Sequence, residues 1–256
     1  MSSHTYTLSM PYGDVPVTVT ERGAGAPVLL LHGGAGADSF AGFADQLAAR
    51  LPVRVLTPVN PGFGGTPRPD GLDSVRKLAE VYARLLAELD LAGVTVAGNS
   101  IGGWVAAELA LAAPDRVARL FVIDGAGLVS ADHPAADFSS LTLDQVTDLS
   151  WANPEGHRID LSALTDAQRA IFGGNRAALS VYGGRTMADP SLAGRLSGIT
   201  ADTLVVWGDA DRMFTPGYGK EYAAAIPGAS FRLLPGAGHL PQLETPEAVL
   251  TLFAQG

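Results

Sequence analysis

Short apolar runs alternate along this chain with longer stretches of helical periodicity. The run Val28–Leu31 is continuously apolar and precedes a glycine-rich segment, which is typical of a strand buried on both faces. The clearest helix is expected over residues 74–89, where apolar side chains recur at steps of three and four residues. Strands that alternate with helices in this way indicate βαβ units and a largely parallel sheet.

The remaining elements divide the chain into three parts. Pro16 suggests that the strand over residues 15–20 lies at a sheet edge, because proline cannot donate a ladder hydrogen bond. From about Gly125 to Gly198 the strand patterns disappear. We therefore expect a core over residues 1–124, a small helical cap over 125–198 and the rest of the core over 199–256. Further strands are expected at 53–57, 93–97, 120–123, 204–207 and 230–234, and further helices at 40–51, 101–113, 216–226 and 245–253.

Composition excludes several classes of protein. Hydrophobic residues make up 47% of the 256 residues, which argues against intrinsic disorder. The net charge of −9 disfavours binding to nucleic acid or to anionic lipid. The chain has no cysteine, so disulfides, thiol catalysis and thiolate metal sites are excluded. No apolar run reaches the roughly 20 residues of a membrane span, and no secretory leader is recognisable, so we expect a cytoplasmic protein.

Gly98–Gly102 forms a G-x-S-x-G motif around Ser100. A strand is expected before it and a helix after it, which is the context that a nucleophile at a sharp strand-to-helix turn requires. The glycines allow the chain to turn tightly enough for Ser100 to project above the sheet. The alternative is a glycine-rich turn with an incidental serine.

A serine hydroxyl needs a base, and His239 is the best-placed histidine. It follows the predicted strand 230–234, and loops at strand carboxyl ends are where such sheets place their sites. The alternative is an exposed loop histidine. The other four histidines are less suitable: His4 lies in a terminal segment, His133 and His157 in the irregular insertion, and His32 is expected to be structural.

Three carboxyls could orient this base. Asp209 and Asp211 follow the predicted strand 204–207, and Asp124 follows the strand that ends at Ile123. A carboxylate here would fix the tautomer of the imidazole and stabilise its charged form. Aspartate is also common in turns, so each could be a turn former. The residues alone leave the choice open.

The segment His32–Gly36 could supply an oxyanion site. Its glycines allow backbone N–H groups to point at a developing negative charge. A phosphate-binding loop is the alternative, but the dinucleotide spacing and the GK[ST] ending are absent. Serine, aspartate and histidine then follow in this order, each after a predicted strand, which is the order of the α/β-hydrolases.

The chain resembles the α/β-hydrolase superfamily over essentially its whole length. The resemblance is carried by HGGAG, GNSIGG, WGDADRMF and GAGHLPQLETPEAV. It implies an α/β fold whose mostly parallel, eight-stranded sheet is flanked by helices, with a helical cap inserted after the sixth strand. It also implies roles for five residues: Ser100 as nucleophile, His239 as base, Asp211 as acid, and Gly34 and Ile101 as backbone oxyanion donors. No metal or organic cofactor is implied.

Within the superfamily, GNSIGG and the HGG loop resemble meta-cleavage-product hydrolases, which cleave carbon–carbon bonds. Asn99 matches the asparagine before their nucleophile, whereas Leu240 departs from their usual tryptophan. They also use a cap arginine, for which Arg169, Arg176 and Arg185 are available. The departure favours a carboxylesterase-like serine hydrolase over a carbon–carbon hydrolase. Further alternatives are a cofactor-independent oxygenase or lyase and a non-catalytic ligand-binding protein.

The cap is expected to supply most of the substrate pocket. Apolar side chains there would favour a small to medium, fairly apolar molecule, acted on by a monomer or homodimer. Each cap side chain could instead pack the cap's own core. The expected lining residues are Asn99, Leu128, Val129, Trp151, Phe172, Tyr182, Met187 and Leu240.

Overall fold

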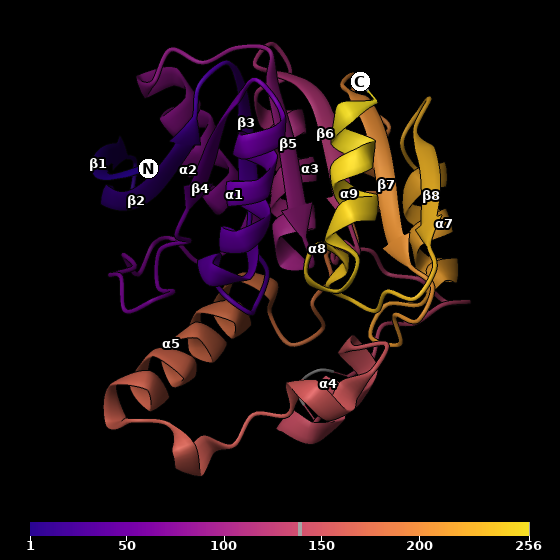
Figure 1. The fold of residues 1–256 in the computed structure, drawn as a ribbon. Coiled ribbons are helices and arrows are strands. Elements are labelled where there is room, and N and C mark those ends of the chain that lie inside the picture. Colours follow the sequence, from indigo (N-terminus) through magenta and orange to yellow (C-terminus); the bar gives the residue numbers. More distant parts are fainter. Residues whose placement is uncertain (138–139, 256) are drawn as a thin grey trace.

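An eight-stranded sheet forms the centre of the molecule in the computed structural model, which describes residues 1–137 and 140–255 (Figure 1). The strand order is β1-β2-β4-β3-β5-β6-β7-β8. β2 is antiparallel to both its neighbours, and all other pairs are parallel. The mostly parallel sheet is therefore confirmed. The strands are β1 (Ser2–Met10), β2 (Gly13–Gly23), β3 (Ala26–Leu31), β4 (Val53–Pro58), β5 (Val94–Asn99), β6 (Val117–Ile123), β7 (Asp202–Gly208) and β8 (Ser230–Leu234).

Helices cover both faces of the sheet, and the alternation of strand side chains explains why. Val28 and Leu30 belong to one buried cluster, whereas Leu29 and Leu31 belong to another. The first cluster lies beneath α1 (Ala41–Arg50) and α9 (Pro246–Ala254). The second lies beneath α2 (Val75–Glu88), α3 (Ile101–Ala112) and α7 (Pro216–Ala224). A continuous apolar run thus serves two cores, as expected for a strand buried on both faces.

The amino-terminal end of the sheet differs from the prediction. β1 forms the outer strand, and β2 lies between β1 and β4, so the expectation that residues 15–20 form an edge strand is wrong. Pro16 is nevertheless tolerated there for a local reason. Only Val19–Gly23 of β2 pairs with β4, so Pro16 has a neighbouring strand on one side only.

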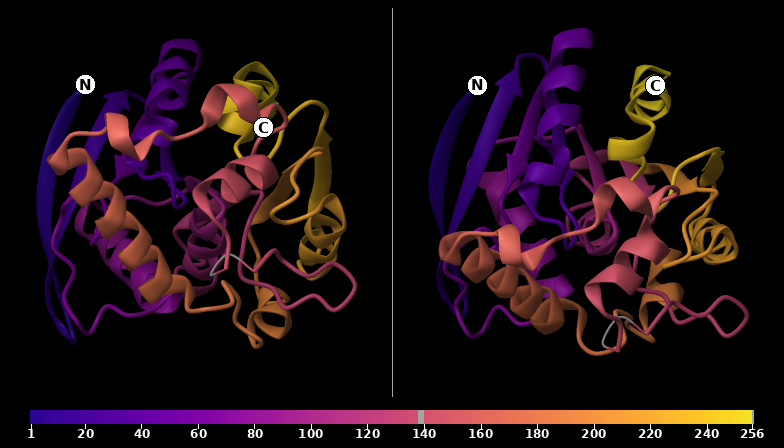
Figure 2. Two further views of the ribbon diagram at one scale, coloured as in Figure 1. Left: turned by 90° about the horizontal axis from the view of Figure 1, so that it is seen from below. Right: turned by 60° about the horizontal axis from the view of Figure 1, so that its bottom comes forward.

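The segment between β6 and β7 leaves the sheet and returns to the adjacent position. In the described part of this segment the elements are helical: α4 (Leu143–Ser150), η2 (Pro154–His157), η3 (Leu161–Ala163), α5 (Asp166–Gly183) and α6 (Leu192–Leu196). α4 and α5 lie beyond the carboxyl ends of the parallel strands, with α5 on the side of the amino-terminal strands and α4 on the side of β7 and β8 (Figures 1 and 2). This segment therefore lies over the edge of the sheet where the candidate site residues were expected.

Two short elements complete the connections near the site. The 3-10 turn η1 (Ala37–Phe40) precedes α1, and α8 (Pro241–Glu244) follows the histidine loop. No helix within residues 1–137 and 140–255 combines the length and the apolar character that a membrane span needs.

Candidate active site

Ser100 stands at the sharp turn between β5 and α3. Its backbone is strained, with φ 60° and ψ −125°, a conformation that costs about 1–3 kcal/mol in a non-glycine residue. A Cβ at Gly98 would overlap the carbonyl of Gly102, and a Cβ at Gly102 would overlap the carbonyl of Leu31. Both glycines of the motif are therefore required by close backbone approach, as the sequence pattern predicts.

Hydrogen bonds from the next strand hold this turn. The Ser100 amide donates to the Ile123 carbonyl at 3.0 Å, and the Ser100 carbonyl accepts from the amides of Gly103 at 2.9 Å and Ala126 at 3.0 Å. The backbone that presents the hydroxyl is thus tied to both β6 and α3. Such bonds offset the strain and keep the serine side chain in place.

His239 and Asp211 form a buried pair in two neighbouring loops. His239 Nδ1 lies 2.8 Å from Asp211 Oδ2. The other carboxylate oxygen, Oδ1, accepts from the amides of Met213 at 2.8 Å and Phe214 at 3.1 Å. The ring of Phe214 packs against the imidazole with its centroid 5.4 Å away. This arrangement places the Nδ1 proton of the imidazole on the Asp211 side and leaves Nε2 able to accept a proton.

Ser100 and His239 line the same cavity, which has a volume of about 330 Å³. They keep 9% and 8% of their surface exposed, so both can be reached from this cavity. Asp211 lies behind His239 with 1% exposure. The structure therefore brings together the serine, histidine and aspartate that were singled out from the sequence.

The two other aspartates occupy different environments. Asp209 is exposed, and its Oδ1 accepts from the Gly236 amide at 2.8 Å, so it serves the turn. Asp124 is fully buried, and its Oδ1 accepts from the Gly208 amide at 3.0 Å. Burial, together with the neighbouring Asp211 charge, raises the pKa of Asp124 well above its usual value. Of the three carboxyls, Asp211 is the one hydrogen-bonded to His239.

Two backbone amides are the predicted oxyanion donors. Gly34 lines the cavity, and Ile101 directly follows Ser100 at the start of α3. Across residues 1–137 and 140–255, neither amide has a hydrogen-bond acceptor. The amino-terminal end of α3 adds a positive partial charge at the same point. An anionic oxygen held between these two N–H groups would satisfy both.

Asn99 connects the turn at Ser100 to the histidine loop. Its Nδ2 donates to the carbonyl of His239 at 2.8 Å and to that of Ile123 at 3.2 Å. Its Oδ1 accepts from Gln242 Nε2 at 3.2 Å. Asn99 lines the cavity, as expected. It also has a structural role, because these bonds fix His239 relative to Ser100.

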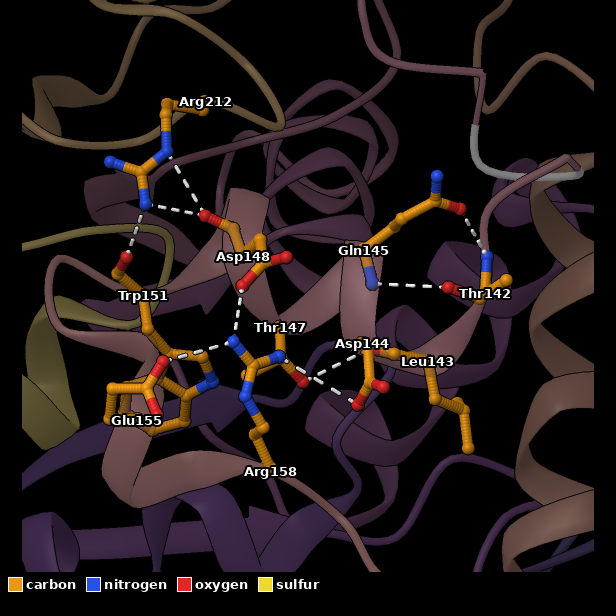
Figure 3. Close-up of polar contacts among 10 residues, drawn as sticks. All are labelled: Thr142, Leu143, Asp144, Gln145, Thr147, Asp148, Trp151, Glu155, Arg158 and Arg212. Carbon is orange, nitrogen blue, oxygen red and sulfur yellow. Dashed lines mark hydrogen bonds and ion pairs between the residues drawn. The ribbon is translucent and has the colours of Figure 1, made fainter.

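The helix α4 is bonded directly to the loops that carry the pair. The His239 amide donates to the Ser150 carbonyl at 2.6 Å, and the Arg212 amide donates to the Leu149 carbonyl at 3.0 Å. The Arg212 side chain donates to the Asp148 carbonyl from Nε at 3.0 Å and to the Trp151 carbonyl from Nη2 at 2.7 Å (Figure 3). A cation at a helix carboxyl end is stabilising. Because α4 lines one side of the cavity, that side is bonded directly to the loops that carry His239 and Asp211.

A second arginine holds the exposed side of the same helix. Arg158 contacts the carboxylates of Asp148 at 2.9 Å, Glu155 at 3.2 Å and Asp144 at 3.7 Å (Figure 3). These groups are largely solvent-exposed, so each pair contributes little to stability. All three carboxylates belong to the segment between β6 and β7, whereas Arg212 bonds this segment from the loop that carries Asp211.

Five of the predicted lining residues reach the cavity: Asn99, Trp151, Phe172, Met187 and Leu240. Leu128 and Tyr182 do not, which corrects the prediction for both. Leu128 is buried in the core, where its backbone bonds the hydroxyl of Tyr218, and the Tyr182 hydroxyl donates to the Pro61 carbonyl at 2.8 Å. Val129 is 61% exposed and lies outside the cavity lining.

Sequence reasoning missed one regular feature of the lining. α4 contributes four residues at steps of three and four, which is a helical stripe that the sequence alone could have revealed: Leu143, Val146, Thr147 and Ser150. Met213 and Phe214 also line the cavity, because the bonds that Asp211 accepts from their amides turn the chain toward it. No local pattern predicts this, nor the lining positions of Leu179, Ile159 and Leu243.

The remaining histidines have separate surroundings. His32 is buried, its Nε2 accepts from the Asn60 amide at 3.0 Å, and burial lowers its pKa to about 4. It is therefore a neutral, structural histidine, as predicted. His157 lines the cavity, where its ring stacks on Trp151 with centroids 3.4 Å apart. His4 lies in β1 and His133 in the irregular segment after β6.

The three arginines named as possible cap arginines, Arg169, Arg176 and Arg185, lie in different surroundings. Arg176 lines the cavity. Arg169 donates to the carbonyl of Leu161 at 3.0 Å and pairs with Asp166 at 2.7 Å, and Arg185 is exposed. Among acidic and histidine groups of the described residues, Asp124, Asp211 and His239 are near enough to share an ion, but His239 Nδ1 is already engaged with Asp211.

Comparison with known proteins now decides the family. The model of the alpha/beta hydrolase family matches residues 28–252. The chain belongs to this family. The comparison supports a hydrolase without naming the substrate.

Individual relatives differ in activity. A 2-hydroxy-6-oxononadienedioate/2-hydroxy-6-oxononatrienedioate hydrolase of Cupriavidus pinatubonensis is 31% identical, over 89% of this chain and 86% of its own length. Lipase 1 of Psychrobacter immobilis is 27% identical, over 93% and 79%. The acetyltransferase component of an acetoin cleaving system from Cupriavidus necator is 30% identical over 90% of this chain, which spans 63% of that protein.

Solved structures share the fold. An esterase from Thermogutta terrifontis superposes with a TM-score of 0.80 at 23% identity, covering all of this chain and 97% of the esterase. At this identity the likeness supports the architecture alone.

Proposed function

We propose that this α/β-hydrolase is a serine hydrolase that cleaves a carboxylic ester, or a similar acyl bond, of a small to medium apolar substrate. The observation that carries the proposal is the strained Ser100, which shares a narrow, largely apolar cavity with the His239–Asp211 pair. A serine hydroxyl becomes nucleophilic when a neighbouring base removes its proton. The cavity volume of about 330 Å³ suits a substrate of this size.

The reaction follows from the roles of the residues. His239 Nε2 takes the proton from Ser100, whose oxygen attacks the carbonyl carbon. The negative charge on the carbonyl oxygen is held by the amides of Gly34 and Ile101. His239 then gives its proton to the leaving group, and an acyl-enzyme remains. Water attacks the acyl-enzyme by the reverse route, while Asp211 stays charged and orients the imidazole.

Hydrolysis of p-nitrophenyl esters with graded acyl length tests the proposal. Ser100→Ala is expected to lower kcat by at least about a thousandfold, because the oxyanion donors alone retain only residual catalysis. Ser197→Ala, at an exposed serine whose Oγ donates to the Gly194 carbonyl at 2.9 Å, is the matched control. A fluorophosphonate should also label Ser100 and not Ser197. Wild-type hydrolysis no faster than that of Ser100→Ala would contradict the proposal.

The second candidate is a carbon–carbon hydrolase. It is favoured by Arg176, a cation in the cavity lining, and by the relative from Cupriavidus pinatubonensis. Arg176→Met separates the two candidates. An ester hydrolase with an uncharged substrate should keep its KM for the esters, whereas an enzyme for an anionic vinylogous diketone should bind that substrate at least about tenfold more weakly.

Two other functions remain distinguishable. A cofactor-independent oxygenase or lyase should keep much of its activity in Ser100→Ala and lose it in His239→Ala. A ligand-binding protein should turn over none of the esters. We further propose that the enzyme is cytoplasmic and acts on a small molecule as a monomer or homodimer. Sedimentation of the purified chain would test the oligomeric state.

A further inference from the structure

Asp124 is a second buried carboxyl beside the proposed catalytic acid. It follows β6 as Asp211 follows β7, and its backbone is held at φ 46°. One atom each of Asp124, Asp211 and His239 lie within 4.8 Å of one another. The proposed acyl transfer does not use Asp124. A fully buried aspartate in a strained conformation is nevertheless costly to keep without a function.

The two carboxyls have unequal sets of hydrogen bonds. Asp211 accepts from two backbone amides and faces the His239 ring nitrogen, so both of its oxygens are engaged. Asp124 accepts one backbone amide at Oδ1, whereas its Oδ2 is buried and no donor of the described residues reaches it. Two carboxylates so close together in a buried site cannot both be ionised. The proton belongs on the carboxyl with fewer donors, which is Asp124.

We propose that protonated Asp124 donates a hydrogen bond from Oδ2 to the Asp211 carboxylate and thereby acts as a positioning residue for the Asp211–His239 pair. Its effect on catalysis rests on the proposed function, because the pair matters for rate only if His239 is the base. The donor keeps the negative charge on Asp211, where the imidazole needs it, and limits rotation of the carboxylate. It also gives the otherwise unpartnered Oδ2 an acceptor.

The charges around Asp124 agree with this assignment. Burial is the largest cause that raises its pKa, followed by the Asp211 charge, and Glu244 on α8 acts in the same direction. The Gly208 amide on β7 opposes the rise. Arg212 does not compensate, because its guanidinium is bonded to the carbonyls at the end of α4. A ring nitrogen of His239 also lies within 4.8 Å of an Asp124 carboxyl oxygen, but the hydrogen bond of Nδ1 goes to Asp211.

The first test does not depend on activity. A carboxyl that is protonated in the folded state and ionised in the unfolded state binds an extra proton on folding, so stability falls as pH rises above about 4. Asp124→Asn removes this proton and keeps an N–H donor. The unfolding constant of wild type should therefore increase relative to that of Asp124→Asn by up to about tenfold per pH unit above pH 4.

Asp209→Asn is the matched control, since Asp209 is the exposed aspartate of the turn that carries Asp211. Its unfolding curve should stay parallel to that of wild type across the same pH range. Parallel curves for wild type and Asp124→Asn would overturn the proposal, because Asp124 would then bind no extra proton on folding. This outcome is independent of whether the protein hydrolyses esters.

The second test compares two substitutions in ester hydrolysis. Asp124→Asn should keep kcat within about threefold of wild type, because its amide can still donate to Asp211. Asp124→Leu lacks a donor and should lower kcat by about ten- to a hundredfold with KM unchanged, the effect of losing one hydrogen bond to a charged group. Equal rates for the two variants would assign Asp124 a purely structural role and overturn the proposal.

A loss of more than about a hundredfold in Asp124→Asn would also overturn it, because ionised Asp124 would then be required. If Asp124→Leu fails to fold, the unfolding comparison and the Asp124→Asn rate still decide. Absence of ester hydrolysis by wild type would contradict the proposed function and leave the unfolding test standing.

Discussion

Asp211→Asn isolates the contribution of the proposed acid without removing its structural bonds. The new side chain keeps an oxygen for the amides of Met213 and Phe214, so the turn is preserved. Its NH₂ group now faces His239 Nδ1, 2.8 Å away in the wild type, where the imidazole had donated. The imidazole must then carry its proton on Nε2, and it cannot accept the proton of Ser100.

The expected loss follows from this change of tautomer. The comparable substitution in a serine protease lowers kcat by about 10⁴-fold, and the same geometry here predicts a loss of about 10³- to 10⁴-fold, or about 4–5 kcal/mol of transition-state stabilisation. The free energy of unfolding should change by less than about 2 kcal/mol, because the bonds from the Met213 and Phe214 amides remain. Initial rates on a p-nitrophenyl ester and denaturant unfolding measure the two quantities.

Asp209→Asn is the control for this experiment as well, since Asp209 belongs to the same turn and bonds the Gly236 amide instead of the imidazole. It should hydrolyse the ester at the wild-type rate. A folded Asp211→Asn variant within tenfold of the wild-type rate would refute the reasoning, and so would an equal loss in Asp209→Asn.

Three further predictions concern the oxyanion loop, the buried histidine and the cap. Gly34→Ala would place a Cβ 3.0 Å from Leu179 Cδ2, a contact that the end of the Leu179 side chain can relieve, so the Gly34 amide should stay in place and kcat should stay close to the wild-type value in steady-state assays. Burial lowers the pKa of His32 to about 4, so on acidification the unfolded chain binds a proton at this histidine before the folded protein does. The free energy of unfolding should therefore fall by up to about 3 kcal/mol between pH 6.5 and 4. In denaturant titrations, His32→Asn should flatten this part of the curve of unfolding free energy against pH. Arg212→Gln should lower both Tm and kcat by loosening the bonds between α4 and the acid loop, whereas Arg158→Gln should leave kcat unchanged.

Each of these has a clear contrary result. A large loss of kcat in Gly34→Ala would show that the added Cβ displaces the Gly34 amide rather than the Leu179 side chain. An unchanged acid slope in His32→Asn would assign the acid lability to other groups. Equal kcat effects of the two arginine substitutions would show that the cap acts only through its overall stability.

Much of the fold could be predicted from local patterns, because each buried parallel strand is a short apolar run and each covering helix repeats at three to four residues. The strand before Ser100 and the helix after it were visible in this way. β1 was missed because one face of it is exposed: its pattern of buried and exposed residues mixes polar side chains with Leu8 and lacks a continuous apolar run. The edge position inferred from Pro16 holds at Pro16 itself but not for the whole strand, because pairing of residues 19–23 with β4 and of β2 with β1 is a long-range event that no local pattern records.

The sequence by itself determined which residue types stand at the carboxyl ends of the strands: Ser100 between obligatory glycines, and aspartate and histidine after β7 and β8. These placements follow from chain geometry, since parallel strands end at a common edge. Only the tertiary structure decided between the three carboxyls, because the choice depends on contacts between loops more than 25 residues apart, namely Asp211 with His239 and the unpartnered oxygen of Asp124. It also decided which cap side chains face the cavity, because Leu128 and Tyr182 are drawn into the core by hydrogen bonds to distant residues.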